Sequence, residues 1–86
     1  MAEQRDTSRR FEGRRVLITG AARGIGAALA RRLHEGGARV ALAGLEPDHL
    51  QALAGELDAP WWECDVSDHQ RVTQVVDEAA EGLGGL

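Results

Sequence analysis

Two short apolar runs, at residues 16–18 and 40–43, are followed by a third stretch at residues 61–64 that is apolar except for Glu63. The first two runs are continuous rather than alternating, and all three stretches are too short to form a helix. Continuous apolar runs that end in turn residues are typical of strands buried on both faces of a parallel sheet. The pattern therefore predicts three β-strands.

The first stretch between these runs carries apolar residues at helical spacing. Ile25, Leu29 and Leu33 recur at every fourth position beside small alanines, and Gly36-Gly37 follows as a helix C-cap would. The spacing predicts a helix that buries this apolar stripe and packs closely through its alanines.

Two further helices are expected after the second and third runs. Pro47 suits the first turn of a helix, and Ser67 with Gln70 matches the spacing of a capping box at the start of the last one. The apolar positions of the two stretches are Leu50, Leu53, Ala54 and Leu57, and then Val72, Val75, Val76, Ala79, Ala80 and Leu83.

The elements therefore alternate in the order βαβαβα, which predicts an α/β fold with a parallel sheet and right-handed crossovers. Residues 1–13 are polar and rich in arginine, and we expect a flexible leader there. Residues 14–86 form the expected folded domain.

Composition excludes several classes of protein. With 86 residues the chain has room for one domain, and no apolar run approaches the length of a membrane span. Its ten basic residues are all arginines, and the net charge of -4 argues against a nucleic-acid partner. Cys64 is the single cysteine, which predicts a reducing, cytoplasmic location. The histidines form no metal-ligand pattern, so no metal site is expected.

The stretch Thr19–Gly26, TGAARGIG, joins the first strand to the first helix. Gly20 permits the tight turn, Gly24 leaves the backbone open to a pyrophosphate, and Gly26 lets the helix approach the sheet. The helix N-terminus then offers free N–H groups to the phosphates. The spacing differs from G-x-G-x-x-G, and a P-loop is excluded because the chain has no lysine.

This motif closely resembles that of the short-chain dehydrogenases/reductases, and so does the Cys64–Asp68 stretch CDVSD. The resemblance covers roughly residues 11–86 and implies a Rossmann-like fold, truncated here after the third helix, with NAD or NADP as cofactor. It implies that the phosphates and ribose are held by Gly20, Gly24, Ile25 and Gly26. It further implies that Asp65 accepts a hydrogen bond from the adenine amine beside Val66. Leu45, just beyond the second strand, is also assigned to the cofactor site.

The choice of cofactor depends on the end of the second strand. NAD-binding proteins of this fold carry an acid there for the ribose 2′-OH, and this position is Gly44. Glu46 lies two residues further and substitutes for that acid if its loop turns inward. Arg23 resembles the basic residue of NADP-dependent members. Together these residues favour NADP over NAD without excluding NAD.

The family's catalytic motifs, an asparagine, a serine and a Tyr-x-x-x-Lys pair, have no counterpart here. The chain has no tyrosine and no lysine. We therefore expect an N-terminal cofactor-binding part of an oxidoreductase that is inactive alone, with its substrate bound only in a full-length form. The alternatives are a non-catalytic dinucleotide-binding module and a truncated remnant. The first strand would lie at the edge of the sheet, and this predicts self-association.

Overall fold

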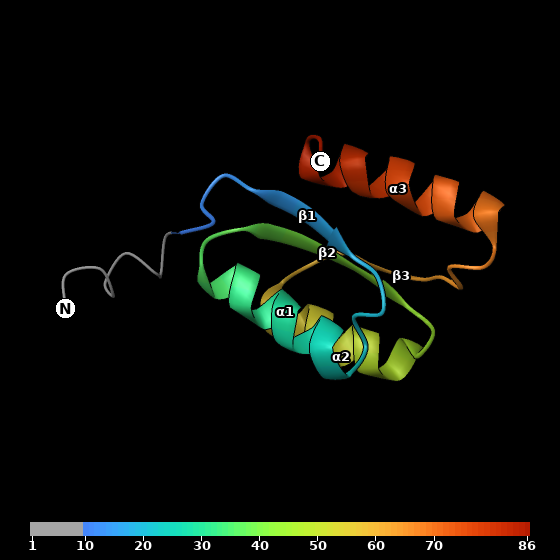
Figure 1. The fold of residues 1–86 in the computed structure, drawn as a ribbon, viewed down its shortest axis with the longest axis horizontal. Coiled ribbons are helices and arrows are strands. Elements are labelled where there is room, and N and C mark those ends of the chain that lie inside the picture. Colours follow the sequence, from blue (N-terminus) through green and yellow to red (C-terminus); the bar gives the residue numbers. More distant parts are fainter. Residues whose placement is uncertain (1–9) are drawn as a thin grey trace.

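The computed structural model describes residues 10–86 and contains six elements in the expected order (Figure 1). The strands are β1 (Arg15–Ile18), β2 (Arg39–Gly44) and β3 (Trp61–Glu63). The helices are α1 (Gly24–Glu35), α2 (Pro47–Leu57) and α3 (His69–Leu83). Each predicted strand is found within one residue of its expected ends.

The three strands form one parallel sheet with β2 in the middle and β1 and β3 at its edges. Val16 pairs with Val40, and Ala43 pairs with Trp62. The helices lie in two layers, with α1 and α2 on one face of the sheet and α3 on the other (Figure 1). Right-handed crossovers that move in one direction require this arrangement of α1 and α2. The predicted α/β, Rossmann-like class is confirmed.

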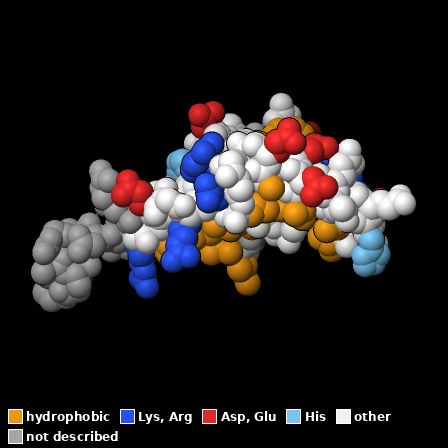
Figure 2. Space-filling model, turned by 90° about the horizontal axis from the view of Figure 1, so that it is seen from above, with side chains coloured by type: hydrophobic (Ala, Val, Ile, Leu, Met, Phe, Trp, Pro, Cys, Tyr) orange, Lys and Arg blue, Asp and Glu red, His pale blue; other side chains and the backbone are white. Residues whose placement is uncertain are grey.

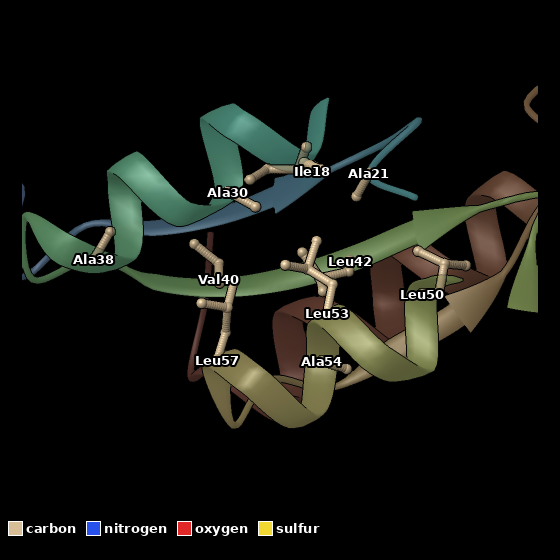
Figure 3. Packing of buried hydrophobic residues seen from close by; sticks show 11 residues of the cluster. Ile18, Ala21, Ala30, Ala38, Val40, Leu42, Leu50, Leu53, Ala54 and Leu57 are labelled. Atoms are coloured by element: carbon tan, nitrogen blue, oxygen red, sulfur yellow. The ribbon is translucent and has the colours of Figure 1, made fainter. Parts of the chain in front are cut away.

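Most of the core lies between the sheet and the α1–α2 layer (Figure 3). Leu42 of β2 and Leu50 of α2 are fully buried there. The α3 face holds two smaller clusters, centred on Ala41 and on Ala43 with Val75. The eleven buried residues of the larger cluster are Ile18, Ala21, Ala27, Ala30, Ala38, Val40, Leu42, Leu50, Leu53, Ala54 and Leu57.

Helix α1 does not bury the stripe that its sequence predicts. Ile25 is 89% exposed and Leu29 is 46% exposed, whereas the buried residues of the helix are Ala27 and Ala30. Small side chains allow the helix to lie close to the sheet; Ile25 and Leu29 are turned away, whereas Leu33 is partly buried against the core. The prediction of an apolar stripe buried beneath α1 was therefore wrong for Ile25 and Leu29.

The predicted capping box of α3 was also wrong. The helix begins one residue later, with Asp68 as its N-cap, and Asp68 Oδ1 accepts a hydrogen bond of 3.1 Å from the backbone N–H of Arg71. The Ser67 hydroxyl is instead turned towards Asp65, to which it donates a hydrogen bond. Asp and Ser are both good N-caps, and the local turn decides between them.

Residues 10–13, at the end of the expected leader, pack against the end of α1. The N–H of Phe11 donates to the carbonyl of Gly36 at 2.7 Å, and the Phe11 ring lies against the space where Gly36 has no side chain. Residues 1–9 of the expected leader lie outside the described residues.

Candidate functional site

A pocket of about 340 Å³ opens at the carboxyl ends of the three strands. In α/β folds this is the edge at which ligands bind, because the loops that follow the strands meet there. Two backbone hydrogen bonds hold these loops together, from Ala21 N–H to Ala43 C=O at 3.1 Å and from Cys64 N–H to Gly44 C=O at 2.8 Å. The lining residues are Thr19, Gly20, Ala22, Arg23, Gly44, Leu45, Glu46, Cys64 and Val66.

The glycine turn at this pocket depends on its glycines for different reasons. Gly20 and Gly24 have φ values of 63° and 58°, in the left-handed region that other residues avoid. Gly26 has an ordinary backbone, but a Cβ placed on it would overlap the carbonyl group of Gly20. The turn is thus held close to the first turn of α1 at Gly26, where the sequence predicts a close approach of the helix to the sheet.

The N-terminus of α1 is left open to a ligand. Its N-cap residue, Arg23, has an extended backbone and makes no capping hydrogen bond, and the first turn contains no acidic residue. The first N–H groups of a helix have no partner within the helix, and they carry the positive end of its dipole. Uncapped N–H groups beside a pocket provide a binding site for phosphate oxygens.

Arg23 and Glu46 face each other across the pocket. Arg23 Nη2 lies 2.5 Å from Glu46 Oε2, and both side chains are partly exposed. His49 Nδ1 is 3.7 Å from the same carboxylate oxygen. The loop after β2 therefore turns inward, which is the condition under which Glu46 replaces an acid at position 44. Gly44 lies beside the glycine turn, and a Cβ placed on it would make ordinary contacts of 3.6 Å with the backbone nitrogens of Ala21 and Ala22.

Asp65 follows β3 and is held by its neighbour Ser67. The Ser67 backbone N–H and hydroxyl both donate to Asp65 Oδ1, at 2.9 and 2.7 Å. These bonds, the backbone one first, hold the pKa of the Asp65 carboxyl below its usual value. They leave the second carboxylate oxygen for another donor.

The structure brings four of the eight predicted site residues into the pocket lining, namely Gly20, Arg23, Leu45 and Val66. Leu45 and Val66 are 62% and 60% exposed, an unusual degree for large apolar side chains beside a pocket. Gly24, Ile25 and Gly26 form the first turn of α1 instead, and Asp65 lies between the lining residues Cys64 and Val66.

Sequence reasoning assigned no site role to Thr19, Ala22 and Cys64, which also line the pocket. Each lies at or just beyond the carboxyl end of a strand, and that position was the signal that would have found them. Neither tryptophan is among the lining residues. Trp61 packs on the α1–α2 side, and the indole N–H of Trp62 donates to Glu78 of α3 at 2.8 Å.

The sheet order, the glycine turn and the open N-terminus of α1 are accompanied by a match to a known protein family. The family model for short chain dehydrogenases matches residues 14–86, nearly the whole described chain. This chain belongs to the short-chain dehydrogenase family. The resemblance seen in the sequence is thereby confirmed.

Related short-chain dehydrogenases and solved structures support the assignment. Tropinone reductase-like 2 of Erythroxylum coca is 42% identical over 80 residues, which are 91% of this chain and 29% of that protein. Glucose 1-dehydrogenase of Gluconobacter oxydans is 41% identical over 83 residues, 90% of this chain and 31% of that enzyme. A Burkholderia cenocepacia short chain dehydrogenase in complex with NADP superposes with a TM-score of 0.85, at 38% identity over 90% of this chain and 34% of the other.

The chain therefore spans about a third of the length of the short-chain dehydrogenases that it matches. In the part of the chain that the structure describes, no three His, Cys, Asp or Glu side chains gather as a metal site would require. No helix of that part has the length and hydrophobicity needed to cross a membrane.

Proposed function

We propose that this chain binds a nicotinamide dinucleotide, as the N-terminal cofactor-binding part of an oxidoreductase. The supporting observation is the pocket at the carboxyl ends of the strands, which is lined by Arg23, the N-cap residue of the uncapped helix α1. The pyrophosphate would lie on the N–H groups of Gly24, Ile25 and Gly26. The adenine would lie between Leu45 and Val66, with its amine donating to Asp65.

In the full-length enzyme the bound cofactor would supply or accept a hydride, with a carbonyl compound or an alcohol as substrate. The residues of this chain bind and orient the cofactor. None of them is assigned as the acid or base, because the chain has neither the tyrosine nor the lysine of the family motif. We therefore expect the purified chain to show no reduction of ketones or oxidation of alcohols above a heat-killed control, measured by nicotinamide absorbance.

Calorimetric titration with NADP and NAD tests the binding proposal. Gly24→Val should abolish binding, because its side chain enters the path of the pyrophosphate. This change also strains the backbone, since Gly24 has positive φ. Gly13→Val is the matched control, because Gly13 also has positive φ (85°), also has open space around it, and is not among the pocket residues. Equal binding by the two variants would contradict the site.

We propose NADP as the preferred cofactor, with Arg23 as the partner of its 2′-phosphate. Arginine binds phosphate through paired N–H donors, but here Glu46 competes for the same guanidinium. Glu46→Gln should therefore strengthen NADP binding and weaken NAD binding, and Arg23→Gln should weaken NADP binding alone. For exposed charges we expect changes of about twofold to fivefold. Tighter NAD than NADP binding by the unaltered chain would overturn the preference.

The second candidate is a non-catalytic dinucleotide-binding module or a truncated remnant. The coding DNA beyond Leu86 distinguishes the two candidates. An open frame that encodes the Tyr-x-x-x-Lys motif supports the enzyme, and a stop codon supports the module or remnant. A cytoplasmic location stays a prediction from the single, buried cysteine.

A further inference from the structure

His49 stands beside the ion pair of Arg23 and Glu46, and the cofactor site described above gives it no role. It lies in the first turn of α2, and its Nδ1 is 3.7 Å from Glu46 Oε2. Arg23 Nη2 contacts the same oxygen. One carboxylate oxygen therefore faces two side chains that can carry a positive charge. All three side chains are partly exposed to solvent, which leaves them free to change partners.

The strength of the contact between His49 and Glu46 depends on a proton. A separation of 3.7 Å is too long for a hydrogen bond, although it is within the range of an ion pair. Histidine is the side chain whose charge ordinarily changes between about pH 5 and pH 8. A protonated His49 attracts the Glu46 carboxylate and donates to it, whereas a neutral ring leaves the carboxylate to Arg23. The proton on His49 thus changes how strongly Glu46 holds Arg23.

Within α2 the charges next to His49 act in both directions. Asp48 precedes it in the first turn and attracts a protonated ring, as Glu46 does. The positive end of the helix dipole repels such a ring. Of these groups, Glu46 is the one for which the structure records a contact with His49.

The elements packed against α2 are α1, β2 and β3. Glu63 ends β3 on the face that α2 covers, because side chains alternate along a strand and Trp61, two residues earlier, packs on that face. Its carboxylate adds to the attraction of a protonated His49. Arg31 of α1 is paired with Glu56, about two helical turns further along α2. The charged residue of β2 lies at the start of that strand, at the opposite end of the sheet from the pocket.

The release of one arginine matters because the rest of the molecule attracts a phosphate weakly. The net charge of the chain is -4. Figure 2 shows arginine side chains standing apart on the face seen from above, without a large basic area. Arg23 is the only arginine among the residues that line the pocket. The attraction of the pocket for an additional phosphate therefore depends on whether Arg23 is free to bind it.

We propose that His49 is a further determinant of the choice between NADP and NAD, acting as a positioning residue for Glu46. The inference rests on the proposed dinucleotide site. When His49 is protonated, Glu46 divides its attraction between two cations, and Arg23 turns more readily to the 2′-phosphate of NADP. When His49 is neutral, Glu46 holds Arg23 and accepts the ribose 2′-OH of NAD. His49 itself is not among the residues that line the pocket.

Calorimetric titrations with NADP and with NAD, at about pH 6 and about pH 8.5, test this role. The ratio of NADP to NAD affinity in the unaltered chain should rise about twofold to fivefold at the lower pH, beyond any change in His49→Gln. The 2′-phosphate also takes up a proton near pH 6, but it does so with every variant, so the difference between variants reports the histidine. His34→Gln is the matched control. His34 lies in the last turn of α1, away from the pocket, and the unaltered pH dependence should remain.

A double-mutant cycle separates a positioning role from a direct effect of charge. His49→Gln should leave the affinity ratio unchanged when Glu46→Gln is already present, because no carboxylate remains for the histidine to attract. An equal effect of His49→Gln with and without Glu46 would overturn the proposal, and so would identical pH profiles of the unaltered chain and His49→Gln. If neither dinucleotide binds to the unaltered chain at either pH, the proposed function itself is wrong, and the role of His49 is excluded with it.

Discussion

Helices α1 and α3 both begin a few residues beyond the carboxyl end of a strand, but their first turns differ. Helix α3 is closed by its own sequence, since Asp68 accepts the N–H of Arg71. Helix α1 has an arginine at the same position, no capping bond and no acid in its first turn. A capping side chain is worth about 1 kcal/mol to a helix. The chain forgoes this stabilisation at α1, the helix that opens into the pocket.

The difference shows how a ligand site can be recognised from missing interactions. Helix N-termini attract anions whether or not an anion is the natural ligand, so the dipole alone does not separate α1 from α3. The two ends differ in whether the backbone N–H groups are already satisfied, and in the charge of the N-cap residue. At α1 the N-cap is cationic, and it lies beside a pocket.

The largest expected effect comes from the close packing of α1 on the glycine turn. Gly26→Val would overlap the Gly20 carbonyl, which is backbone and cannot move aside without shifting the turn. We expect a loss of about 3 kcal/mol in the free energy of unfolding, at the upper end for overpacking. Urea denaturation measures it.

The matched control for Gly26→Val is a helical glycine of α3. Gly82→Ala meets open space and should raise the stability by about 0.5–1 kcal/mol, the usual gain in a helix. If Gly26→Val lowered the free energy of unfolding no more than Gly82→Ala does, the close contact between the glycine turn and α1 would be contradicted.

Arg23→Asp would convert the start of α1 into a copy of the start of α3. An aspartate at the N-cap should stabilise the helix by about 1 kcal/mol, but it would place a negative charge where the phosphates are expected to bind. We expect dinucleotide affinity to fall by at least about tenfold, equivalent to ~1.4 kcal/mol.

The measurements for Arg23→Asp are a thermal melt and a calorimetric titration, which should move in opposite directions. Arg23→Gln removes the cation without adding a cap, and it separates the loss of positive charge from the gain of an acid. A variant that is more stable and binds the cofactor as well as the unaltered chain would show that the open end of α1 is not the phosphate site.

The sequence predicted features that depend on neighbouring residues, and it missed features that depend on contacts between separate elements. The βαβαβα order and the glycine turn depend on local pattern, and the structure shows both. The burial of α1 depends on how closely that helix approaches the sheet, so Ile25 was expected inside and lies outside. The N-cap of α3 depends on the local turn, in which Ser67 donates to Asp65 and Asp68 accepts from the N–H of Arg71. The ion pair between Arg23 and Glu46 joins two loops, and periodicity carries no signal for it.

Asp68→Ala removes the cap that distinguishes α3. We expect a loss of about 1 kcal/mol of stability, with dinucleotide affinity unchanged because Asp68 is not a pocket residue. Asp68→Asn retains a capping oxygen and should behave like the unaltered chain. The affinity is measured under conditions in which the variant is fully folded. A lower cofactor affinity for Asp68→Ala would then mean that the N-terminus of α3 affects binding at the N-terminus of α1, and this would contradict the proposal.

The smallest expected effect is the response of the two ends to acid. Ser67 lowers the pKa of Asp65, so the folded chain holds that carboxylate more strongly than the unfolded chain does. The resulting stabilisation is fully present above the unfolded-state pKa of about 3.9 and is lost as the pH falls through the lower folded-state value. No acid lies in the first turn of α1, so only the loop before α3 should loosen.

Amide protection of residues 65–68, followed by NMR between about pH 6 and pH 2.5, measures the change. In Ser67→Ala the backbone donor to Asp65 remains, and the protection should be lost at a higher pH than in the unaltered chain. Equal loss of protection at the starts of α1 and α3 would show that acid acts on the whole fold and not on the aspartate that precedes α3.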